Sequence, residues 1–138
     1  MAMIVFHDQS FAHSPAFLFM LEEFVKLVKT GYADNELNFT NSSFVDYALD
    51  DQQQVAGGCI WTYDPLKRSA WILFSAVREN MRKKGVYKSI IVNVERIAKQ
   101  KGAIVIYSSV HVDNEAMIAA AKSSGRQPNW YRAKKEFK

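Results

Sequence analysis

The spacing of apolar positions in the first third of the chain predicts a strand, a helix and a loop. A short apolar run at 3–7 is typical of a strand. Ser14 followed by Pro15 favours the start of a helix, with serine as the N-cap and proline in the first turn, where its missing N–H costs nothing. The stripe expected to face the core has three- and four-residue spacing and consists of Leu18, Leu21, Val25 and Val28. Gly31 should end the helix, and 32–43 should be a loop.

The middle of the chain predicts three consecutive strands. The segments 44–49, 55–63 and 70–77 are apolar and carry β-branched or aromatic residues, and polar turns separate them. Strands joined by tight turns pair antiparallel, so we expect a meander. Trp61 and Trp71 should pack in or near its core, since large aromatic side chains at strand positions usually do.

A helical period returns after this meander. Apolar residues spaced i, i+3, i+4, i+7 and i+11 predict a helix that ends near Gly102, and they are Tyr87, Ile90, Ile91, Val94 and Ala98. The continuous apolar and hydroxyl run at 103–110 predicts a buried strand. A strand, a loop, a helix and a second strand form a βαβ crossover, so the strands at 70–77 and 103–110 should lie parallel.

The last third predicts one more helix and one more strand. Asp113 or Asn114 can cap a helix that runs through Lys122 and stops at Gly125, and 130–137 alternates enough to form a closing strand. Together these elements predict an α/β fold, with a mixed, mainly antiparallel central sheet and a parallel βαβ crossover at the fourth and fifth strands. At 138 residues the chain should form a single domain from residue 1 to residue 138.

Composition excludes several classes of protein. Hydrophobic residues at 49% and charged residues at 23% are ordinary globular values, which argues against long-range disorder. Cys59 is the only cysteine, so neither an internal disulfide nor a thiolate zinc site can form, and we expect no metal. Its thiol should be buried in the core. No apolar run approaches the roughly 18 residues of a membrane span, and the first residues do not resemble a signal peptide, so we expect a cytoplasmic protein without a membrane partner.

Charge is distributed unevenly about the total of +4. Residues 1–66 carry two basic side chains against nine acidic ones, a net charge of −7, whereas 67–138 carry sixteen against five, a net charge of +11. The second half therefore favours an anionic partner: nucleic acid, a membrane surface or a phosphorylated cofactor.

The segment from Val77 to Tyr87 carries the clearest chemistry. A strand runs into a basic loop that must turn at Gly85 before a helix begins. Backbone N–H groups at a helix start lack partners, and the helix dipole adds positive charge, so such a corner binds phosphate. Around it lie three cationic residues, Arg82, Lys83 and Lys84. A solvated turn remains the alternative, whereas a P-loop and a dinucleotide-binding fingerprint are excluded because the glycines they need are missing.

This segment closely resembles the central motif of the GNAT superfamily of N-acetyltransferases, a hydrophobic strand end followed by R/Q-x-x-G-x-G/A. Arg82 and Gly85 match the motif's anchors, and Ile90 and Ile91 stand where the family has leucines. Downstream, the family's strand-ending valine, helix-opening asparagine and helix-closing glycine are matched in turn by Val110, Asn114 and Gly125. The predicted order of elements also looks like that fold over nearly the whole chain.

The resemblance implies acetyl-CoA as acyl donor and direct transfer of its acetyl group to a primary amine. The pyrophosphate of CoA would lie on backbone amides of Arg82, Lys83, Lys84, Gly85, Val86 and Tyr87. Ala76 and Val77, at the end of the preceding strand, would hydrogen-bond the pantetheine arm, and an amide there could polarise the thioester carbonyl. Asn114 would contact the pantetheine or the cysteamine end, unless it only caps its helix.

Two positions depart from the family pattern. Tyr87 stands where the family has a small residue, so its ring must be housed in the core. Ala121 stands where many members carry a tyrosine that acts as general acid, seven residues after the asparagine. The catalytic residues are therefore unassigned; the weak candidates, each with a structural alternative, are Glu79, Tyr107 and His111.

The acceptor is an unidentified amine, from either a small molecule or a protein. In the resembled fold, the loop after the first helix borders the acceptor site, and acidic residues there would attract an ammonium group. This loop contains Tyr32, Asp34 and Glu36. Proteins of this family often pair, so a homodimer is compatible with the resemblance.

Two other functions stay open. A CoA-binding protein of the same fold, with weak or no transferase activity, is consistent with Ala121. A nucleic-acid-binding module is suggested by the basic half and by interleaved aromatic and cationic residues near the C-terminus, which are Trp130, Tyr131, Arg132, Lys134 and Lys135. We disfavour nucleic acid, because the acidic half would oppose a long polyanion.

Overall fold

The computed structural model describes residues 3–29, 43–108, 115–123 and 125. Several predictions therefore lie outside the described residues. They concern the helix stop at Gly31, the loop with Tyr32, Asp34 and Glu36, the strand end at Val110, His111, the helix cap at Asp113 or Asn114, and the closing strand at 130–137.

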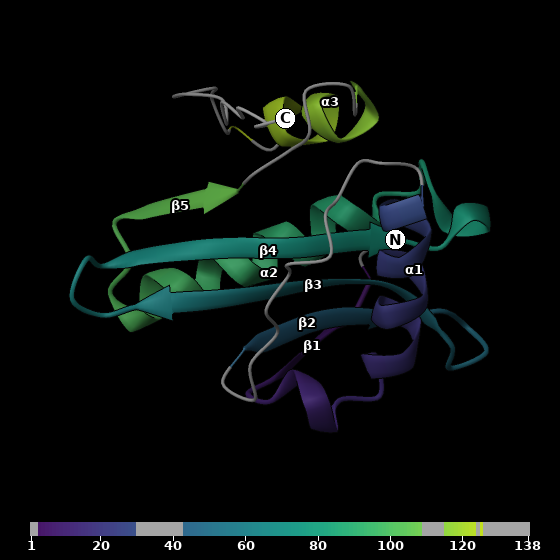
Figure 1. Ribbon diagram of the computed structural model, residues 1–138, viewed down its shortest axis with the longest axis horizontal. Helices are drawn as coiled ribbons and strands as arrows, with labels where there is room; N and C mark the ends of the chain where they lie inside the picture. Colours follow the sequence, from purple (N-terminus) through teal and green to yellow (C-terminus); the bar gives the residue numbers. More distant parts are fainter. Residues whose placement is uncertain (1–2, 30–42, 109–114, 124, 126–138) are drawn as a thin grey trace, which may run out of the picture.

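The described part of the chain contains a five-stranded mixed sheet (Figure 1). Its strands are β1 (Val5–Asp8), β2 (Phe44–Leu49), β3 (Val55–Asp64), β4 (Ser69–Val77) and β5 (Val105–Ser108). They lie in sequence order, antiparallel from β1 to β4, with β5 parallel to β4. The predicted meander and the predicted βαβ crossover are both confirmed.

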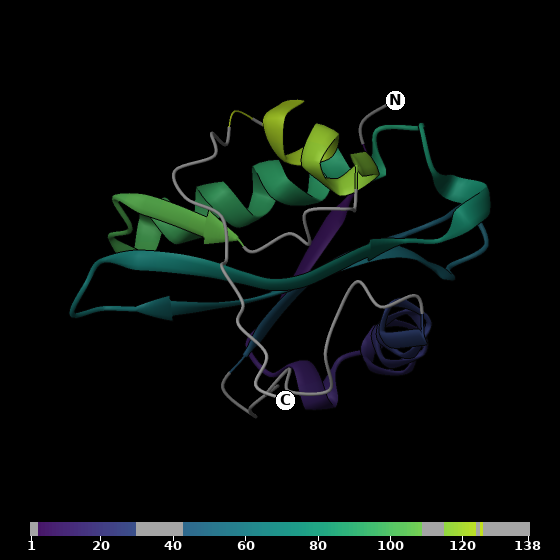
Figure 2. The same ribbon diagram turned by 45° about the horizontal axis from the view of Figure 1, so that its top comes forward.

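Helices cover both faces of this sheet. The helical elements are η1 (Phe11–His13), α1 (Phe17–Lys29), η2 (Glu79–Met81), α2 (Val86–Lys101) and α3 (Glu115–Ser123). Figure 2 shows α1 on one face and α2 on the other. One core cluster lies between the sheet and α2 and the other between the sheet and α1, so the sheet is the middle of three layers. None of the helices in the described ranges has both the length and the hydropathy to cross a membrane.

The rotation of α1 differs from the prediction. Leu18 and Val25 of the predicted inner stripe are 69% and 50% exposed. The side that faces the sheet instead contains the buried Met20 with Phe24 and Leu27 beside it. Nine of the thirteen residues of α1 are apolar, so two stripes with the same spacing compete. The buried stripe carries Phe24, whose ring packs edge-on against Phe74 of β4 at a centroid distance of 5.5 Å. This aromatic contact favours the observed rotation of the helix.

The predicted strand at 103–110 begins two residues later and is less buried than expected, and its residues 109 and 110 lie outside the described residues. β5 pairs with β4 at four positions, Val105 is 36% exposed, and the preceding Ile104 is 70% exposed. The continuous apolar run indicated a strand flanked on both sides, whereas in the described part of the chain β5 is the edge of the sheet.

Other core predictions are confirmed. Cys59 and Trp61 are both completely buried, and Trp71 is partly exposed, with its ring stacked on Tyr107. Of the predicted stripe on α2, all but Tyr87 are buried. Gly102 ends α2 with a φ of 107°, and Gly125 follows α3 with a φ of 86°, both left-handed conformations that suit glycine.

A buried carboxylate ties α2 to the sheet. Asp46 of β2 is completely buried, and one of its oxygens accepts hydrogen bonds from His7 Nδ1 at 2.6 Å and Trp61 Nε1 at 3.0 Å. Its other oxygen accepts one from Asn93 Nδ2 of α2 at 2.8 Å. A buried carboxylate needs such partners, and these donors come from β1, β3 and α2. The network therefore fixes where α2 lies on the sheet.

Candidate functional site

In the described part of the chain, one edge of β4 is open where the strand continues past Ser108 of β5. Within the described residues, the last pair between these two strands is Ile72 with Ser108, and β4 runs on to Val77 against β3. Figure 1 shows β4 extending well beyond the end of β5, which turns away. Among the described residues, none pairs with the β5-facing edge of 73–77. Backbone N–H and C=O groups on such an edge can accept an extended ligand as if it were another strand.

A β-bulge accompanies this divergence. Trp61 of β3 pairs with Ile72 and Ile60 pairs with Phe74, so Leu73 has no partner on β3. A bulge bends its strand and increases the local twist. The extra residue lies directly after the last pair between β4 and β5, so it turns the end of β4 away from its former neighbour.

The register shows which amides face the open edge. The N–H of Arg78 donates to the carbonyl of Ala56 at 2.8 Å, so this pair is hydrogen-bonded across the ladder. Because hydrogen-bonded and non-hydrogen-bonded pairs alternate in an antiparallel ladder, the polar groups of Ala76 point to β3, and those of Ser75 and Val77 point away from it. Of the two residues predicted to line the edge, Val77 therefore directs its amide there and Ala76 directs its amide inward.

Ser75 is a candidate that sequence reasoning missed. Its backbone groups face the same open edge as those of Val77. A serine in the middle of an apolar strand gives no sign of which way its amide points, and only the register reveals this. The carbonyl of Val77 is already an acceptor on this side, because it receives a hydrogen bond from Arg82 Nε at 3.1 Å.

The loop after β4 forms an exposed corner before α2. Gly85 has a φ of 81°, and a Cβ built on it would meet nothing within 4 Å. Lys83 is also left-handed, with a φ of 62°. The amides of Lys83, Lys84 and Val86 donate to no acceptor in the described part of the chain, and the first bond of the helix runs from Ser89 N to the Gly85 carbonyl at 3.0 Å. Within the described residues, the corner therefore has N–H groups without acceptors, the kind of group that binds anions.

The three cations of the loop differ in their surroundings. Lys83 and Lys84 are exposed, and neither forms an ion pair within the described residues. Arg82 instead folds back onto the carbonyl of Val77. The two lysines are thus available to an anion at the corner, while Arg82 also holds the loop against the end of β4.

Close packing holds β4 and α2 together beneath this corner. A Cβ at Gly57 of β3 would lie 2.9 Å from the carbonyl oxygen of Ala76 and 3.1 Å from Val86 Cγ1. Only glycine allows this approach. Tyr87 is partly buried and packs against the core on the α2 face, so its ring is housed at the margin of the core.

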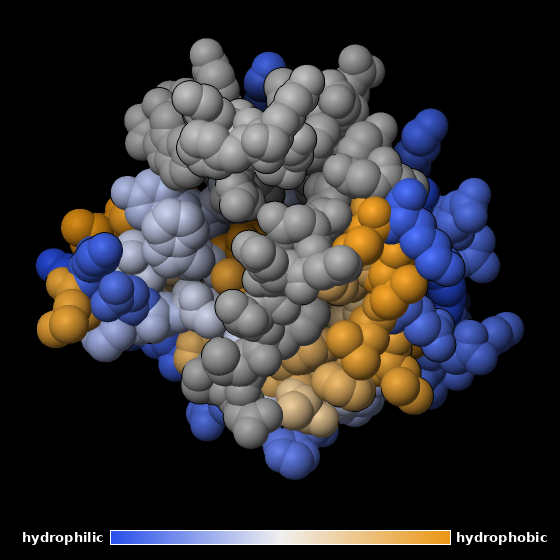
Figure 3. All heavy atoms as spheres, viewed as in Figure 1, coloured by the Kyte–Doolittle hydropathy of each residue, from blue (hydrophilic) through white to orange (hydrophobic). Residues whose placement is uncertain are grey.

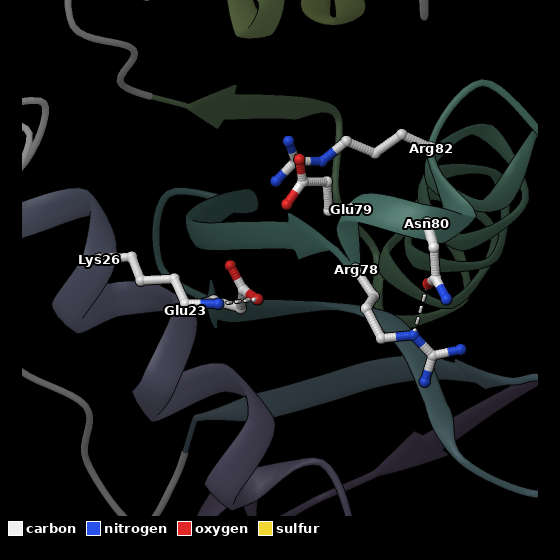
Figure 4. Close-up of a pocket in the computed structure, with 6 residues that line it drawn as sticks. All are labelled: Glu23, Lys26, Arg78, Glu79, Asn80 and Arg82. Atoms are coloured by element: carbon white, nitrogen blue, oxygen red, sulfur yellow. Dashed lines mark hydrogen bonds and ion pairs between the residues drawn. The ribbon is translucent and has the colours of Figure 1, made fainter.

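A pocket of about 570 Å³ lies between α1 and the loop. Two of the side chains that line it belong to α1 and four to the loop after β4, and Figure 4 shows Arg78 and Asn80 turned toward each other and away from Glu23 and Lys26. These lining residues are Glu23, Lys26, Arg78, Glu79, Asn80 and Arg82. Glu79, one of the catalytic candidates, is exposed here, at the end of β4 where the basic loop begins.

Tyr107 lies at the opposite end of the open edge. It pairs with Trp71 across β4 and β5, and the two rings stack at a centroid distance of 4.6 Å. Ala70 and Ile72 belong to the core on the α2 face, so Trp71 between them points to the α1 face. The hydroxyl of Tyr107 forms no hydrogen bond within the described residues. Eight residues of chain separate Trp71 from Glu79, roughly 26 Å of extended strand, so the structure does not bring Tyr107 and Glu79 together.

Pale side chains of intermediate hydropathy gather over the β3, β4 and β5 ends farthest from the basic loop, and apolar ones gather over α1 (Figure 3).

Two further positions bear on catalysis, the candidate His111 and the departure from the family pattern at Ala121. His111 lies outside the described residues, and Ala121 lies within α3, where it supplies no acidic side chain.

Comparison with known proteins identifies the family. The model of the acetyltransferase (GNAT) family matches residues 9–125. A search of curated protein sequences gave no match.

Solved structures agree in fold at low sequence identity. The aminoglycoside acetyltransferase HMB0005 from an uncultured soil metagenomic sample has a TM-score of 0.73 at 17% identity, and the match covers 100% of both chains. Ribosomal-protein-alanine N-acetyltransferase from Brucella melitensis biovar Abortus 2308 has a TM-score of 0.73 at 14% identity, covering 99% of this chain and 100% of that one. Aminoglycoside N-acetyltransferase AAC(6')-Iy, solved in complex with CoA, has a TM-score of 0.68 at 15% identity, covering 98% and 99%.

The family match extends over most of the chain, and the sheet order agrees with the fold that the motif around Arg82 and Gly85 implied. The chain therefore belongs to the GNAT family of acetyltransferases, and the prediction of an N-acetyltransferase is confirmed at the level of the family.

Proposed function

We propose that this protein transfers the acetyl group of acetyl-CoA directly to a primary amine. The observation that carries this proposal is that the open edge of β4 and the exposed amides near Gly85 follow one another along the chain. The open edge of β4 leads to the exposed amides at Gly85, so an extended thiol arm and a diphosphate can bind one after the other. The family match supports the reaction class.

The donor would bind through backbone groups at both features. The pyrophosphate would lie on the amides from Lys83 onward, with the ammonium groups of Lys83 and Lys84 nearby. The pantetheine arm would lie along β4, hydrogen-bonded to Ser75 and Val77. Asn114, proposed to contact the same arm, lies outside the described residues.

In the reaction, a neutral amine would attack the thioester carbon, and the C–S bond would break to release CoA as a thiolate. The amide of Ser75, the next one back from Val77 that faces the open edge, would donate to the carbonyl oxygen as negative charge develops there. The amine loses one proton and the thiolate gains one. Of the candidates for moving these protons, Tyr107 is the described residue that lies where β4 and β5 begin to diverge.

The acceptor would approach from the α1 face of the sheet. Trp71 and Tyr107 expose a stacked aromatic pair there, and such rings attract an ammonium group through their π-faces. Two acceptor classes are suggested by the names of the structural neighbours, an aminoglycoside and an alanine of a ribosomal protein.

Ala121 favours a second candidate function, a CoA-binding protein with little transferase activity. The two are separated by measuring binding and turnover on the same sample. Acetyl-CoA at about 100 times its dissociation constant should stabilise the protein by roughly 2.7 kcal/mol, a shift of several degrees in Tm. Release of free thiol should then require an amine from a panel of aminoglycosides and alanine-initiated peptides.

A Tm shift without thiol release from any amine would favour the binding protein. No shift with acetyl-CoA would refute the acyl-CoA site itself. Steeply salt-dependent binding of single-stranded DNA in that case would favour the nucleic-acid alternative.

A further inference from the structure

Arg78, the first residue after β4, connects three separate parts of the fold. Its Nη2 donates to Asp50 Oδ2 at 2.5 Å, and its Nη1 donates to the carbonyl of Val55 at 3.1 Å. Its Nε donates to Asn80 Oδ1 at 2.8 Å. These partners belong to the turn between β2 and β3, the start of β3, and η2. One guanidinium group therefore joins the basic loop to the neighbouring turn between β2 and β3 at the same end of the sheet.

The carboxylate that receives Arg78 is itself held in place. Asp50 Oδ1 accepts the backbone N–H groups of Gln52 at 2.8 Å and Gln54 at 3.0 Å, which closes the turn around it. The side chains of Arg78 and Asp50 are 26% and 13% exposed, so their contact is partly shielded from water. The hydrogen bond from Arg78, followed by that from Gln54, lowers the pKa of Asp50 below its ordinary value.

The backbone of Arg78 is fixed as well. Its N–H donates to Ala56 at 2.8 Å, and its carbonyl accepts from Met81 at 2.8 Å, which closes the turn of η2. From Arg78, four further residues lead to Arg82, where the exposed corner begins. The direction in which the loop leaves β4 is therefore set by contacts that point away from the corner.

We propose that Arg78 is a positioning residue for the anion site. Held by Asp50, it fixes the start of the loop so that the amides near Gly85 converge on the diphosphate, and it does not bind the phosphates itself. This inference rests on the proposed function. It assigns Arg78 a role different from that of Lys83 and Lys84, although all three are basic residues of one short segment.

Two substitutions separate positioning from direct binding. Asp50→Asn removes a negative charge, so if Arg78 bound phosphate directly, it would leave CoA affinity unchanged or increase it. If Arg78 positions the loop, Asp50→Asn and Arg78→Gln should each weaken CoA binding by roughly ten-fold or more, because a charge-assisted hydrogen bond is lost in both. The double variant should bind no more weakly than the weaker of the two single variants, since both disrupt one interaction.

The experiment is calorimetric titration of CoA into the wild type, the two single variants and the double variant, at a temperature where thermal scans show all four folded. Lys99→Gln is the control for net charge, because Lys99 lies in the last turn of α2, at the other end of that helix from the corner. Its CoA affinity should match that of the wild type. Amide hydrogen exchange over 79–85, without ligand, should be faster in both single variants.

Unchanged CoA affinity in Asp50→Asn, with weakened affinity in Arg78→Gln, would overturn the inference in favour of direct phosphate binding. Unchanged affinity in both would show that the loop is held by other contacts. Should Arg78→Gln fail to fold, Arg78→Lys replaces it, with a smaller loss expected because one donor group remains. Wild-type protein that does not bind CoA would refute the proposed function instead, and the hydrogen-exchange result would still test whether Arg78 holds the loop.

Discussion

Asn93 on α2 donates a hydrogen bond to Asp46 on β2 across the interface between helix and sheet. The same helix begins at the exposed corner near Gly85, about two turns before Asn93. A contact in the interior thus determines how the helix start is presented to solvent. His7 and Trp61 complete the set of donors to this carboxylate.

Asp46→Asn should therefore destabilise the fold. The amide nitrogen would face donors where a carboxylate oxygen now accepts, leaving a buried group unsatisfied at a cost of about 1–3 kcal/mol. Urea unfolding monitored by fluorescence measures this cost. Asp51→Asn is the matched control, since Asp51 is exposed in the turn after β2 and its free energy of unfolding should change by less than about 0.5 kcal/mol. Equal effects of the two substitutions would contradict the importance of the buried network.

Gly85→Glu should abolish CoA binding while the protein stays folded. The new side chain has open space, but its carboxylate would repel the diphosphate, and the φ of 81° adds a modest strain of about 1–2 kcal/mol. Gly85→Asn is the control, because asparagine tolerates this conformation and carries no charge. It should retain CoA binding in the same titration. Wild-type affinity in Gly85→Glu would show that the diphosphate binds elsewhere.

Proline substitutions test the register at the open edge. In Ser75→Pro, the N–H that is lost faces away from β3, so the sheet should survive while the rate of acetyl transfer falls by roughly 100-fold. In Ala76→Pro, the lost N–H faces Gly58, so stability should fall by about 3 kcal/mol. Thermal scans and thiol-release assays on both variants distinguish these outcomes. The reverse pattern would mean that the ladder is assigned one residue out of phase.

Tyr107→Phe tests whether the tyrosine hydroxyl moves a proton. Removing a general acid should lower kcat by roughly 100-fold, with little change in the KM of acetyl-CoA. The ring stacked on Trp71 remains, so the sheet should be unaffected. Trp71→Leu provides the contrast, since it should raise the KM of the amine more than it lowers kcat. An unchanged kcat in Tyr107→Phe would leave proton transfer to another group or to water.

The ion pair between Asp50 and Arg78 predicts a pH dependence of stability. Its lowered pKa means that Asp50 binds a proton less readily in the folded state than in the unfolded state. The stabilisation is therefore fully present above the ordinary pKa of 3.8 and is lost as the pH falls through the lower folded value. Urea titrations from neutral pH to below pH 3.8 should show a steeper acid loss for the wild type than for Asp50→Asn. Parallel curves would contradict this pairing.

The strand order, the crossover and the loop before α2 could be predicted because each has a local signal. Apolar runs separated by polar turns predicted the three strands of the meander. Gly85, followed by an apolar stripe of helical spacing, predicted the loop and α2. The inner face of α1 could not be predicted, because its nine apolar residues form two competing stripes and packing against Phe74 decides its rotation.

Contacts between residues that lie far apart in the chain could not be predicted from the sequence either. Asp50 and Arg78 lie 28 residues apart, and no motif connects them. The orientation of Ser75 depends on a bulge at Leu73, which the apolar pattern of the strand does not reveal. Local patterns thus predicted which segments matter, whereas the contacts that orient them required the folded chain.

Gly57 lies on β3, a strand that contributes no group to the proposed donor site, yet it packs against both elements that form this site. A methyl group at this position would push against the carbonyl of Ala76 and the side chain of Val86 at the same time. The gap between the end of β4 and the first turn of α2 would widen. The distance between the proposed binding sites for the thiol arm and the diphosphate would change with it. If acetyl-CoA binds as proposed, a substitution at Gly57 would therefore alter donor binding although β3 itself contributes no group to the donor site.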